Sequence, residues 1–202
     1  MKVILLTGFE PFGGSHINPS IEACKPLDGK EYNGYKVKVV EIPLRFDEVR
    51  SRLIKAIEVT KPSAVLSTGQ AGSSMIRLER VAINVADARI AYNCGKHPVD
   101  EPIVEGGPVA YFSNLPLRNM LAAIEEEKIP VAISNSAGTF GCNHIFYDLM
   151  HYLKESDLRV PGGFIHVPSL PEQVMKKKGP SMSLGQIVKA LDTAVKIIAE
   201  SL

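Results

Sequence analysis

The chain has 202 residues, 23 Lys and Arg against 22 Asp and Glu, and a formal net charge of +1. Its 45% hydrophobic and 22% charged residues are typical of a globular protein, so neither disorder nor a fibrous repeat is expected. Balanced charge offers no global field for nucleic acid, and no apolar stretch approaches the ~20 residues that span a bilayer. We therefore expect no nucleic-acid partner and no membrane association. The lysine run 176–178 is read as a solvated loop.

In the first half of the chain, apolar runs and helix-end signals predict alternating strands and helices. Met1–Thr7 is a continuous apolar run, which predicts a buried strand. Asn18 and Pro19 predict a helix start, because Asn caps helices well and Pro suits the first helical position. The further elements expected here are a strand over Tyr35–Ile42, a helix with Phe46, Val49, Leu53 and Ile57 on its apolar face, and a short strand over Ala64–Thr68.

The second half begins less regularly. Met75–Asn84 alternates apolar and polar residues, which predicts an extended segment, and Ala91–Gly107 is expected to be a long surface loop of the kind that is often functional. The elements predicted beyond it are a helix that starts at Pro116, a strand over Ile129–Ser134, a helix that opens near Cys142, a strand over Gly163–Val167 and an amphipathic helix from Leu184 to Ile198.

This alternation predicts an α/β fold, with a largely parallel sheet covered by helices on both faces. No linker or internal repeat interrupts it, so we expect a single domain over residues 1–202.

A glycine-rich loop follows the first predicted strand. Gly8, Gly13 and Gly14 do not satisfy the dinucleotide-binding pattern, and no Walker-type lysine follows. Phe9 and Phe12 are unusual in a phosphate cradle. An apolar pocket at the carboxyl end of the strand fits better, because open α/β sheets place their ligands there.

Cys142 is the sharpest chemical signal. It follows a predicted strand and the loop 135–141, and it opens an amphipathic helix. Unpaired N–H groups and the helix dipole favour a thiolate there, and the same N–H groups are suited to stabilising an oxyanion. Position alone does not separate a nucleophile from a small buried core residue.

A cysteine nucleophile needs a base, and His166 is preferred because it ends a short predicted strand beside other strand-end loops. A structural histidine is equally consistent with its position. His144 points to another side of the helix, His151 is too far along it, and His16 and His97 lie in loops without support. Glu79 is the candidate orienting carboxylate, although its spacing by itself favours a surface ion pair with Arg77 or Arg80.

Cys24, placed in the middle of a predicted helix, and Cys94, placed in a loop, are expected to be bystanders. An odd number of cysteines without zinc or CxxC spacing predicts a reduced, cytoplasmic protein with no metal site. The N-terminal apolar run is too short for a signal peptide.

Taken together, these segments resemble the pyroglutamyl-peptidase I (pyrrolidone-carboxylate peptidase) family of cysteine peptidases. The matching motifs run in family order along essentially the whole chain, and they are highly specific as an ordered set. They are Thr7–Gly14 with Asn18-Pro19, Gly69–Gly72, Leu78–Asn84, Ala88–Ile90, Ser136–Asn143 and Gly163–Pro168, with an echo at Pro171–Gln173.

The resemblance implies roles for individual residues. Cys142 would be the nucleophile, His166 the base and Glu79 its orienting carboxylate, which reverses the spacing-based interpretation of Glu79. Arg89 would lie near the oxyanion. The substrate-binding residues implied are Phe9 and Phe12 flanking the ring, Asn18 bracing the site, and Gln70, Ile90 and Phe140 lining the pocket.

The implied activity is removal of an N-terminal pyroglutamyl residue from peptides, through a thioester and without metal or cofactor. The implied fold is a three-layer α/β sandwich resembling the purine phosphorylases, and the implied assembly is a homotetramer. Three positions depart from the family pattern: Gly141 replaces a larger aliphatic residue, Ala91-Tyr92 replaces Pro-Asp, and Ser169-Leu170 replaces an aromatic-aliphatic pair.

Two other functions stay open at this point. One is a different thiol-dependent amidase or hydrolase on an α/β scaffold. The other is a non-catalytic ligand-binding or redox-sensing protein in which Cys142 is merely reactive.

Overall fold

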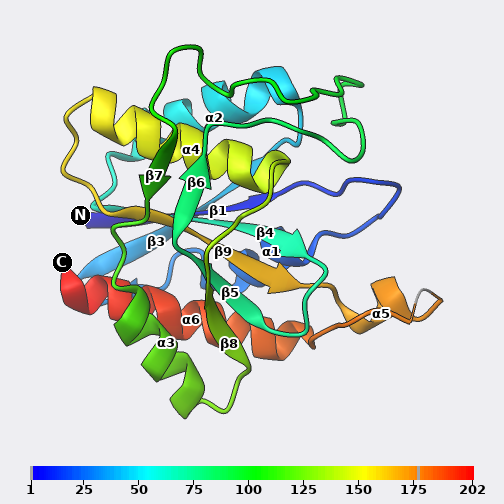
Figure 1. The fold of residues 1–202 in the computed structure, drawn as a ribbon. Helices are drawn as coiled ribbons and strands as arrows, with labels where there is room; N and C mark the ends of the chain where they lie inside the picture. Colours follow the sequence, from blue (N-terminus) through cyan, green and yellow to red (C-terminus); the bar gives the residue numbers. More distant parts are fainter. Residues whose placement is uncertain (1, 177) are drawn as a thin grey trace.

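A seven-stranded sheet forms the centre of the structure, a computed structural model that describes residues 2–176 and 178–202 (Figure 1). Its strand order is β2-β3-β1-β4-β9-β5-β8, and β6 and β7 pair separately. The strands are β1 (Lys2–Phe9), β2 (Glu31–Tyr32), β3 (Tyr35–Ile42), β4 (Ala64–Ala71), β5 (Ile76–Glu79), β6 (Val81–Ile83), β7 (Ala110–Phe112), β8 (Val131–Ser134) and β9 (Gly162–Pro168). The helices are α1 (Pro19–Cys24), a 3-10 turn (Lys25–Leu27), α2 (Phe46–Thr60), α3 (Leu117–Glu126), α4 (Gly141–Glu155), α5 (Pro171–Val174) and α6 (Leu184–Ser201).

The sheet is parallel through its centre and reverses near one edge. Strands β3, β1, β4 and β9 are parallel neighbours, whereas β5 pairs antiparallel with β9 and parallel with β8. Both β5 and β8 therefore run against the central strands. Their reversal sets Arg77 of β5 opposite His166, near the carboxyl end of β9, and Glu79 opposite Phe164, two residues further in.

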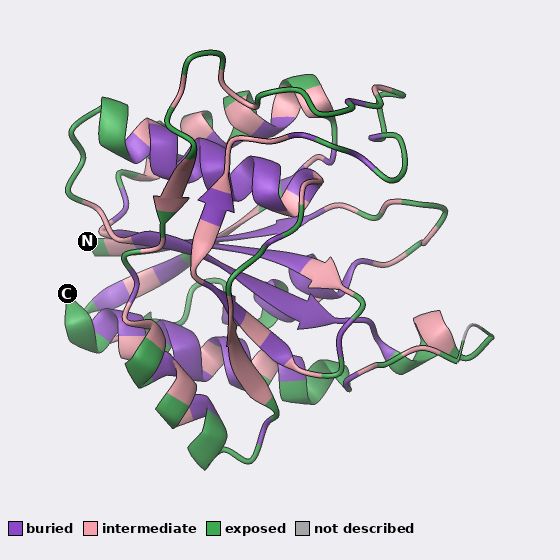
Figure 2. Ribbon diagram, viewed as in Figure 1, coloured by how far each residue is buried: buried purple, intermediate pink, exposed green. Residues whose placement is uncertain are grey.

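Helices cover both faces of the sheet, so alternate residues of a central strand enter two separate cores. Ile4 and Leu6 of β1 pack with α1, α3 and α6, while Leu5 between them packs with α2 and α4. The buried strands between the two helical layers are clear in Figure 2. This arrangement confirms the predicted three-layer α/β fold with a largely parallel sheet.

Most predicted elements are confirmed, apart from shifts of one or two residues at their ends and the following larger differences. The segment Met75–Asn84 is two strands in different sheets, because the chain turns at Arg80. The strand predicted over Ala64–Thr68 continues to Ala71, and Cys24 is the last residue of α1 rather than a mid-helix position. The short elements β2, β7 and α5 were not predicted.

The expected loop over residues 91–107 holds no helix or strand apart from one isolated bridge between Glu101 and Ala86. The predicted N-terminal strand is confirmed from Lys2 onward. Met1, and Lys177 within the lysine run, lie outside the described residues.

Across the described ranges, no helix has both the length and the hydropathy that crossing a bilayer requires.

Gly8 provides a test of the packing between β1 and α1. A Cβ on Gly8 would lie 2.6 Å from the backbone N and Cα of Ile21, whereas a Cβ on Gly185 of α6 would meet nothing within 4 Å. We expect Gly8→Ala to lower the free energy of unfolding by about 3 kcal/mol, because backbone cannot move aside cheaply. Gly185→Ala, the control, should raise it by about 0.5–1 kcal/mol through helix propensity. Equal urea midpoints for the two variants would contradict this account.

Candidate active site

A cavity of about 610 Å³ opens at the carboxyl ends of β1, β4 and β9. This is the edge where the sequence predicted a pocket. Its lining comes from six parts of the chain: Phe9 and Phe12, Leu44, Gln70–Gly72 with Arg77, Asp87 with Arg89 and Ile90, Ser136–Phe140 with Cys142, and His166.

Glu79 and His166 form a buried pair beneath this cavity. In the antiparallel register of β5 with β9, Arg77 lies opposite His166 and Glu79 opposite Phe164, so all four side chains share one face of the sheet. Glu79 Oε1 lies 2.8 Å from His166 Nδ1, and the two residues are 0% and 6% exposed. The surface ion pair of Glu79 with Arg77 or Arg80, which spacing alone favoured, is therefore wrong.

The charges around His166 favour its protonated form. Burial by itself lowers the pKa of His166, but the charge and hydrogen bonding of Cys142, followed by those of Glu79, outweigh burial and raise the pKa to about 9. The ring of Phe164 packs edge-on against the imidazole, with ring centroids 4.9 Å apart. The imidazole is thus held by the carboxylate of Glu79, and the Cys142 thiol is close enough to influence its charge.

Cys142 lies in the first turn of α4, as predicted. Phe140 is the N-cap residue of this helix, and the first N–H groups of a helix have no partner within it. Because β8 runs against β9, the loop 135–140 carries the chain back toward the cavity. A Cβ on Gly69 of β4 would lie 2.5 Å from Cys142 Sγ, so the absent side chain of Gly69 is what lets the sulfur approach the sheet.

The other cysteines lie apart from this arrangement. Cys24 is fully buried, and its burial raises the pKa of the thiol to about 12 against the opposing effect of a hydrogen bond with Thr68. Cys94 is exposed in the loop over residues 91–107. Neither lines the cavity.

Three of the four remaining histidines have structural contacts elsewhere, in agreement with their exclusion as bases. His144 Nδ1 lies 3.2 Å from the Tyr92 hydroxyl, and His151 Nδ1 lies 2.9 Å from the Tyr111 hydroxyl. His97 contacts the carbonyl of Ala88. His16 does not line the cavity.

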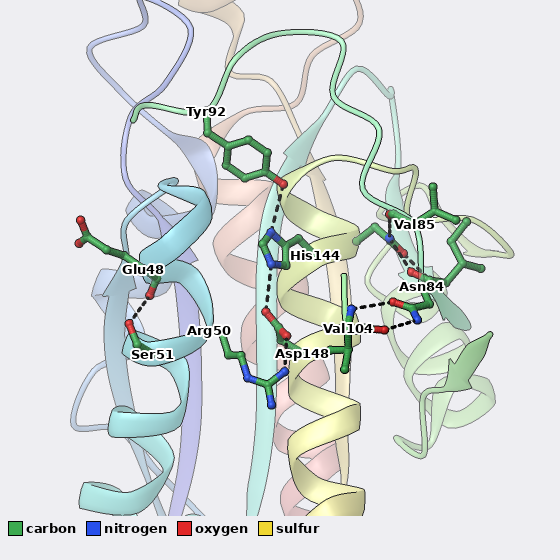
Figure 3. Close-up of polar contacts among 11 residues, drawn as sticks. Glu48, Arg50, Ser51, Asn84, Val85, Tyr92, Val104, His144 and Asp148 are labelled. Atoms are coloured by element: carbon green, nitrogen blue, oxygen red, sulfur yellow. Dashed lines mark hydrogen bonds and ion pairs between the residues drawn. The ribbon is translucent and has the colours of Figure 1, made fainter. Parts of the chain in front are cut away.

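A polar chain supports the cavity wall from behind (Figure 3). Tyr92 packs on Phe140 with ring centroids 4.6 Å apart, and its hydroxyl meets His144. Asp148 Oδ2 lies 3.2 Å from His144 Nε2 without hydrogen-bond geometry, and Asp148 Oδ1 accepts a 3.1 Å hydrogen bond from Arg50. Tyr92 thereby joins the loop over residues 91–107 to α4, directly behind the aromatic wall.

The structure brings most of the predicted pocket residues together and leaves one outside. Phe9, Phe12, Ile90 and Phe140 line the cavity, and Phe9 Cδ2 would be 3.5 Å from a Cβ on Gly69, close to the sulfur. Asn18 is fully buried and does not line the cavity. It caps α1 by accepting from Ser20 N at 3.0 Å and donates to the Glu10 carbonyl at 2.9 Å, so it braces the loop beneath the pocket.

Gln70 is held by two residues near the end of the chain. Its amide donates to Ser169 Oγ at 2.8 Å and lies 3.4 Å from Gln173. Gln173 also donates to the Ile17 carbonyl at 3.1 Å, which joins the loop after β1 to the segment after β9. Ser169, which departs from the family pattern, thus supplies the hydroxyl that orients Gln70 in the cavity.

The departure at Gly141 does not widen the pocket. A Cβ on Gly141 would lie 2.3 Å from Leu44 Cδ1, so Leu44 already occupies the space that a larger residue would fill. Leu44 itself lines the cavity.

Two arginines line the cavity. Arg89 was predicted from the resemblance, and it lies exposed beside Ile90. Arg77 was considered only as a surface partner for Glu79. The sequence signal that could have placed Arg77 in the site is its position two residues before Glu79 on one strand, because such residues share a face of the sheet.

No group of three or more His, Cys, Asp or Glu side chains suited to a metal ion occurs in the part of the chain that the structure describes.

Comparisons with known proteins agree with this architecture over nearly the whole chain. The family model for pyroglutamyl peptidase matches residues 1–201. The pyrrolidone-carboxylate peptidase of Bacillus cereus is 49% identical over 199 residues, covering 98% of this chain and 93% of that protein, and the one of Brevibacillus brevis is 50% identical over 198 residues, covering 97% and 92%.

Solved structures give the same result. Pyroglutamyl peptidase I from Bacillus amyloliquefaciens matches with a TM-score of 0.96 at 44% identity, covering 98% of this chain and 95% of that one. A mutant pyrrolidone carboxyl peptidase from Pyrococcus furiosus matches with a TM-score of 0.96 at 41% identity, covering 99% of both chains.

The fold and these relatives define the class of the protein as an α/β cysteine hydrolase. Within that class, the chain belongs to the pyroglutamyl peptidase family. The resemblance predicted from the motifs is confirmed.

The charge state of His166 can be measured directly. The fold raises the pKa of His166 from 6.5 toward about 9, so the stability from its protonated form is present below pH 6.5 and is lost as the pH rises through about 9. In an NMR titration, with the resonance assigned through His166→Asn, we expect the His166 midpoint above 6.5. Glu79→Gln should lower it, because a carboxylate contact is removed. A midpoint that is identical in the two proteins would contradict the role given to Glu79.

The support behind the cavity wall is also testable. Tyr92→Phe removes a buried hydroxyl and leaves His144 Nδ1 without this partner, so we expect a loss of about 1–3 kcal/mol in the free energy of unfolding. Tyr152→Phe is the control, because its hydroxyl makes an exposed 3.4 Å contact with Glu58. That variant should stay within about 0.5 kcal/mol of the parent. Equal effects in urea unfolding would argue against a buried linkage at Tyr92.

Proposed function

We propose that this protein removes an N-terminal pyroglutamyl residue from peptides by cysteine-dependent hydrolysis. Cys142 is the nucleophile, His166 the general base and acid, and Glu79 the carboxylate that orients the imidazole. The observation that carries the proposal is the position of His166, between buried Glu79 and Cys142 at the wall of an aromatic-lined cavity.

Acylation begins when the Cys142 thiolate attacks the pyroglutamyl carbonyl carbon. The π electrons of the carbonyl move to its oxygen, and the groups proposed to stabilise the negative charge there are the Cys142 N–H, at the start of α4, and the guanidinium of Arg89, which lines the cavity. As the intermediate collapses, the C–N bond breaks and His166 gives its proton to the leaving amine.

Deacylation restores the thiolate of Cys142. His166, now neutral, takes a proton from water, and the resulting hydroxide equivalent attacks the thioester. The C–S bond breaks, pyroglutamate leaves as the free acid, and Cys142 returns as the thiolate paired with protonated His166. Every step uses side chains of this chain, so the proposal requires neither metal nor cofactor.

The cavity suits a neutral lactam better than an ammonium group. Phe9, Phe12 and Phe140 contribute aromatic rings to the lining, and Ile90 adds apolar surface. Gln70, held by Ser169, supplies amide hydrogen-bonding capacity, which matters because an unpaired lactam N–H or C=O costs about 1–3 kcal/mol.

Compartment, assembly and domain organisation complete the proposal. We place the protein in the cytoplasm, on the basis of its odd number of free cysteines. We propose a homotetramer by family resemblance, and a single peptidase domain over residues 1–202. No nucleic-acid or membrane partner is proposed.

A different thiol amidase and a non-catalytic sensor are less well supported than the peptidase. Phe9, Phe12 and Cys142 line the same cavity, which gives pyroglutamate recognition a physical basis. A sensor would not require a buried carboxylate behind its histidine.

The assay measures release of a fluorophore from a pyroglutamyl-amide, with glutamyl and prolyl amides as comparisons. We expect release from the pyroglutamyl substrate alone, and loss by at least about a thousandfold in Cys142→Ser. Iodoacetamide should abolish the activity as well. Cys94→Ser is the matched control, because Cys94 is exposed and outside the cavity, and it should keep parental activity. Equal cleavage of the glutamyl amide would exclude a lactam pocket, and full activity of Cys142→Ser would exclude the nucleophile.

A further inference from the structure

Arg77 lies beside the proposed general acid and has no role in the hydrolysis described above. It is the cross-strand partner of His166 in the pairing of β5 with β9, and such partners in an antiparallel pair project from the same face about 5 Å apart. It also lines the cavity and is half-buried. Its side chain is therefore part of the substrate site itself.

The charge of Arg77 is not neutralised within the described residues. None of the ion pairs found there includes Arg77, and Glu79 is committed to His166. Asp87 is the one carboxylate in the described cavity lining, against two arginines. A half-buried guanidinium without a carboxylate partner is well suited to binding one from the substrate.

The proposed reaction determines which part of the substrate lies beside Arg77. His166 must contact the leaving nitrogen to protonate it, so the residue that follows the scissile amide lies on the His166 side of the cavity. In the proposed function the pyroglutamyl ring packs against Phe9, Phe12 and Phe140, which line the same cavity. The α-carboxylate of a dipeptide is two bonds from the leaving nitrogen, well within the reach of an arginine beside His166.

We propose that Arg77 binds a carboxylate on the leaving-group side of the scissile bond, so that the enzyme favours pyroglutamyl dipeptides with a free C-terminus. This inference rests on the proposed function, and it specifies the substrate class of the same site. An acidic side chain directly after pyroglutamate presents the same chemical group from a second source.

The test compares matched neutral and anionic substrates by the ratio of their kcat/KM values, with products separated by chromatography. One pair is pyroglutamyl-alanine and its C-terminal amide, and the second pair is the amides of pyroglutamyl-glutamate and pyroglutamyl-glutamine. In the parent protein we expect about a tenfold preference for free pyroglutamyl-alanine over its amide, the size of one charge-assisted contact. Added salt should reduce the preference, since Arg77 is only half-buried.

In Arg77→Gln, the ratio should fall to about one. Arg118→Gln is the matched control: it removes the same charge from an exposed position on α3 and should keep the parental ratio. Arg89→Gln should slow both substrates of a pair together, because the oxyanion forms on each. Each ratio compares two substrates on the same protein sample, so it does not change if part of the Arg77→Gln protein is unfolded. The ratio of the parent protein tests the inference even if the variant does not fold.

Each outcome decides the question. A preference confined to the glutamate pair supports the carboxylate site, assigns its source to the side chain and overturns the preference for a free C-terminus. Cleavage of the neutral amides without preference in either pair overturns the inference and leaves the proposed function intact. A ratio that survives in Arg77→Gln, or that is lost in Arg89→Gln instead, also overturns it. No cleavage of any pyroglutamyl substrate overturns both.

Discussion

The contact on which the site depends is the 2.8 Å approach of Glu79 to His166. A fully buried carboxylate is stable as an anion only with a close positive or hydrogen-bonding partner, because its desolvation is otherwise too costly. Glu79 Oε2 has no hydrogen-bond partner among the described residues, so its charge is balanced mainly through the imidazole. The carboxylate and the imidazolium therefore stabilise each other, and Cys142 is the other group that raises the pKa of His166.

This contact needs the reversed strand. If β5 ran parallel to β9, Glu79 would lie at the cavity edge, level with the carboxyl end of β9. In the antiparallel pairing it lies opposite Phe164, two residues below His166, inside the protein. The same reversal extends to β8 and makes the loop 135–140 return along the sheet, which delivers Cys142 to the cavity at the start of α4. The seemingly irregular edge of the sheet is therefore what assembles the three groups.

The sequence predicted the elements better than their directions. Tyr35–Ile42 and the helix after Cys142 follow from local patterns, because apolar periodicity and end signals are properties of short segments. The burial of Glu79 does not follow from local patterns. The alternation of apolar and polar residues around Glu79 would be the same in an edge strand whose polar face is exposed to water. The motif resemblance corrected the interpretation of Glu79. It also implied that Asn18 is a substrate-binding residue, whereas Asn18 lies outside the cavity and contacts a helix N-terminus and a loop carbonyl. Arg77 was missed because register across strands is a long-range property.

The cavity combines two environments with opposite demands on water. Aromatic and aliphatic side chains surround the place proposed for the lactam, where excluding water strengthens the hydrogen bonds that recognise it. Arg77 and Arg89 make another part of the lining polar and cationic, and they are half-buried and exposed, respectively. In the proposed reaction, the amine would leave toward these cationic residues, and the water for deacylation would reach the thioester from their side. A site with uniformly apolar walls would bind the lactam ring equally well. It would, however, retain the leaving peptide and exclude the water that is proposed to hydrolyse the thioester.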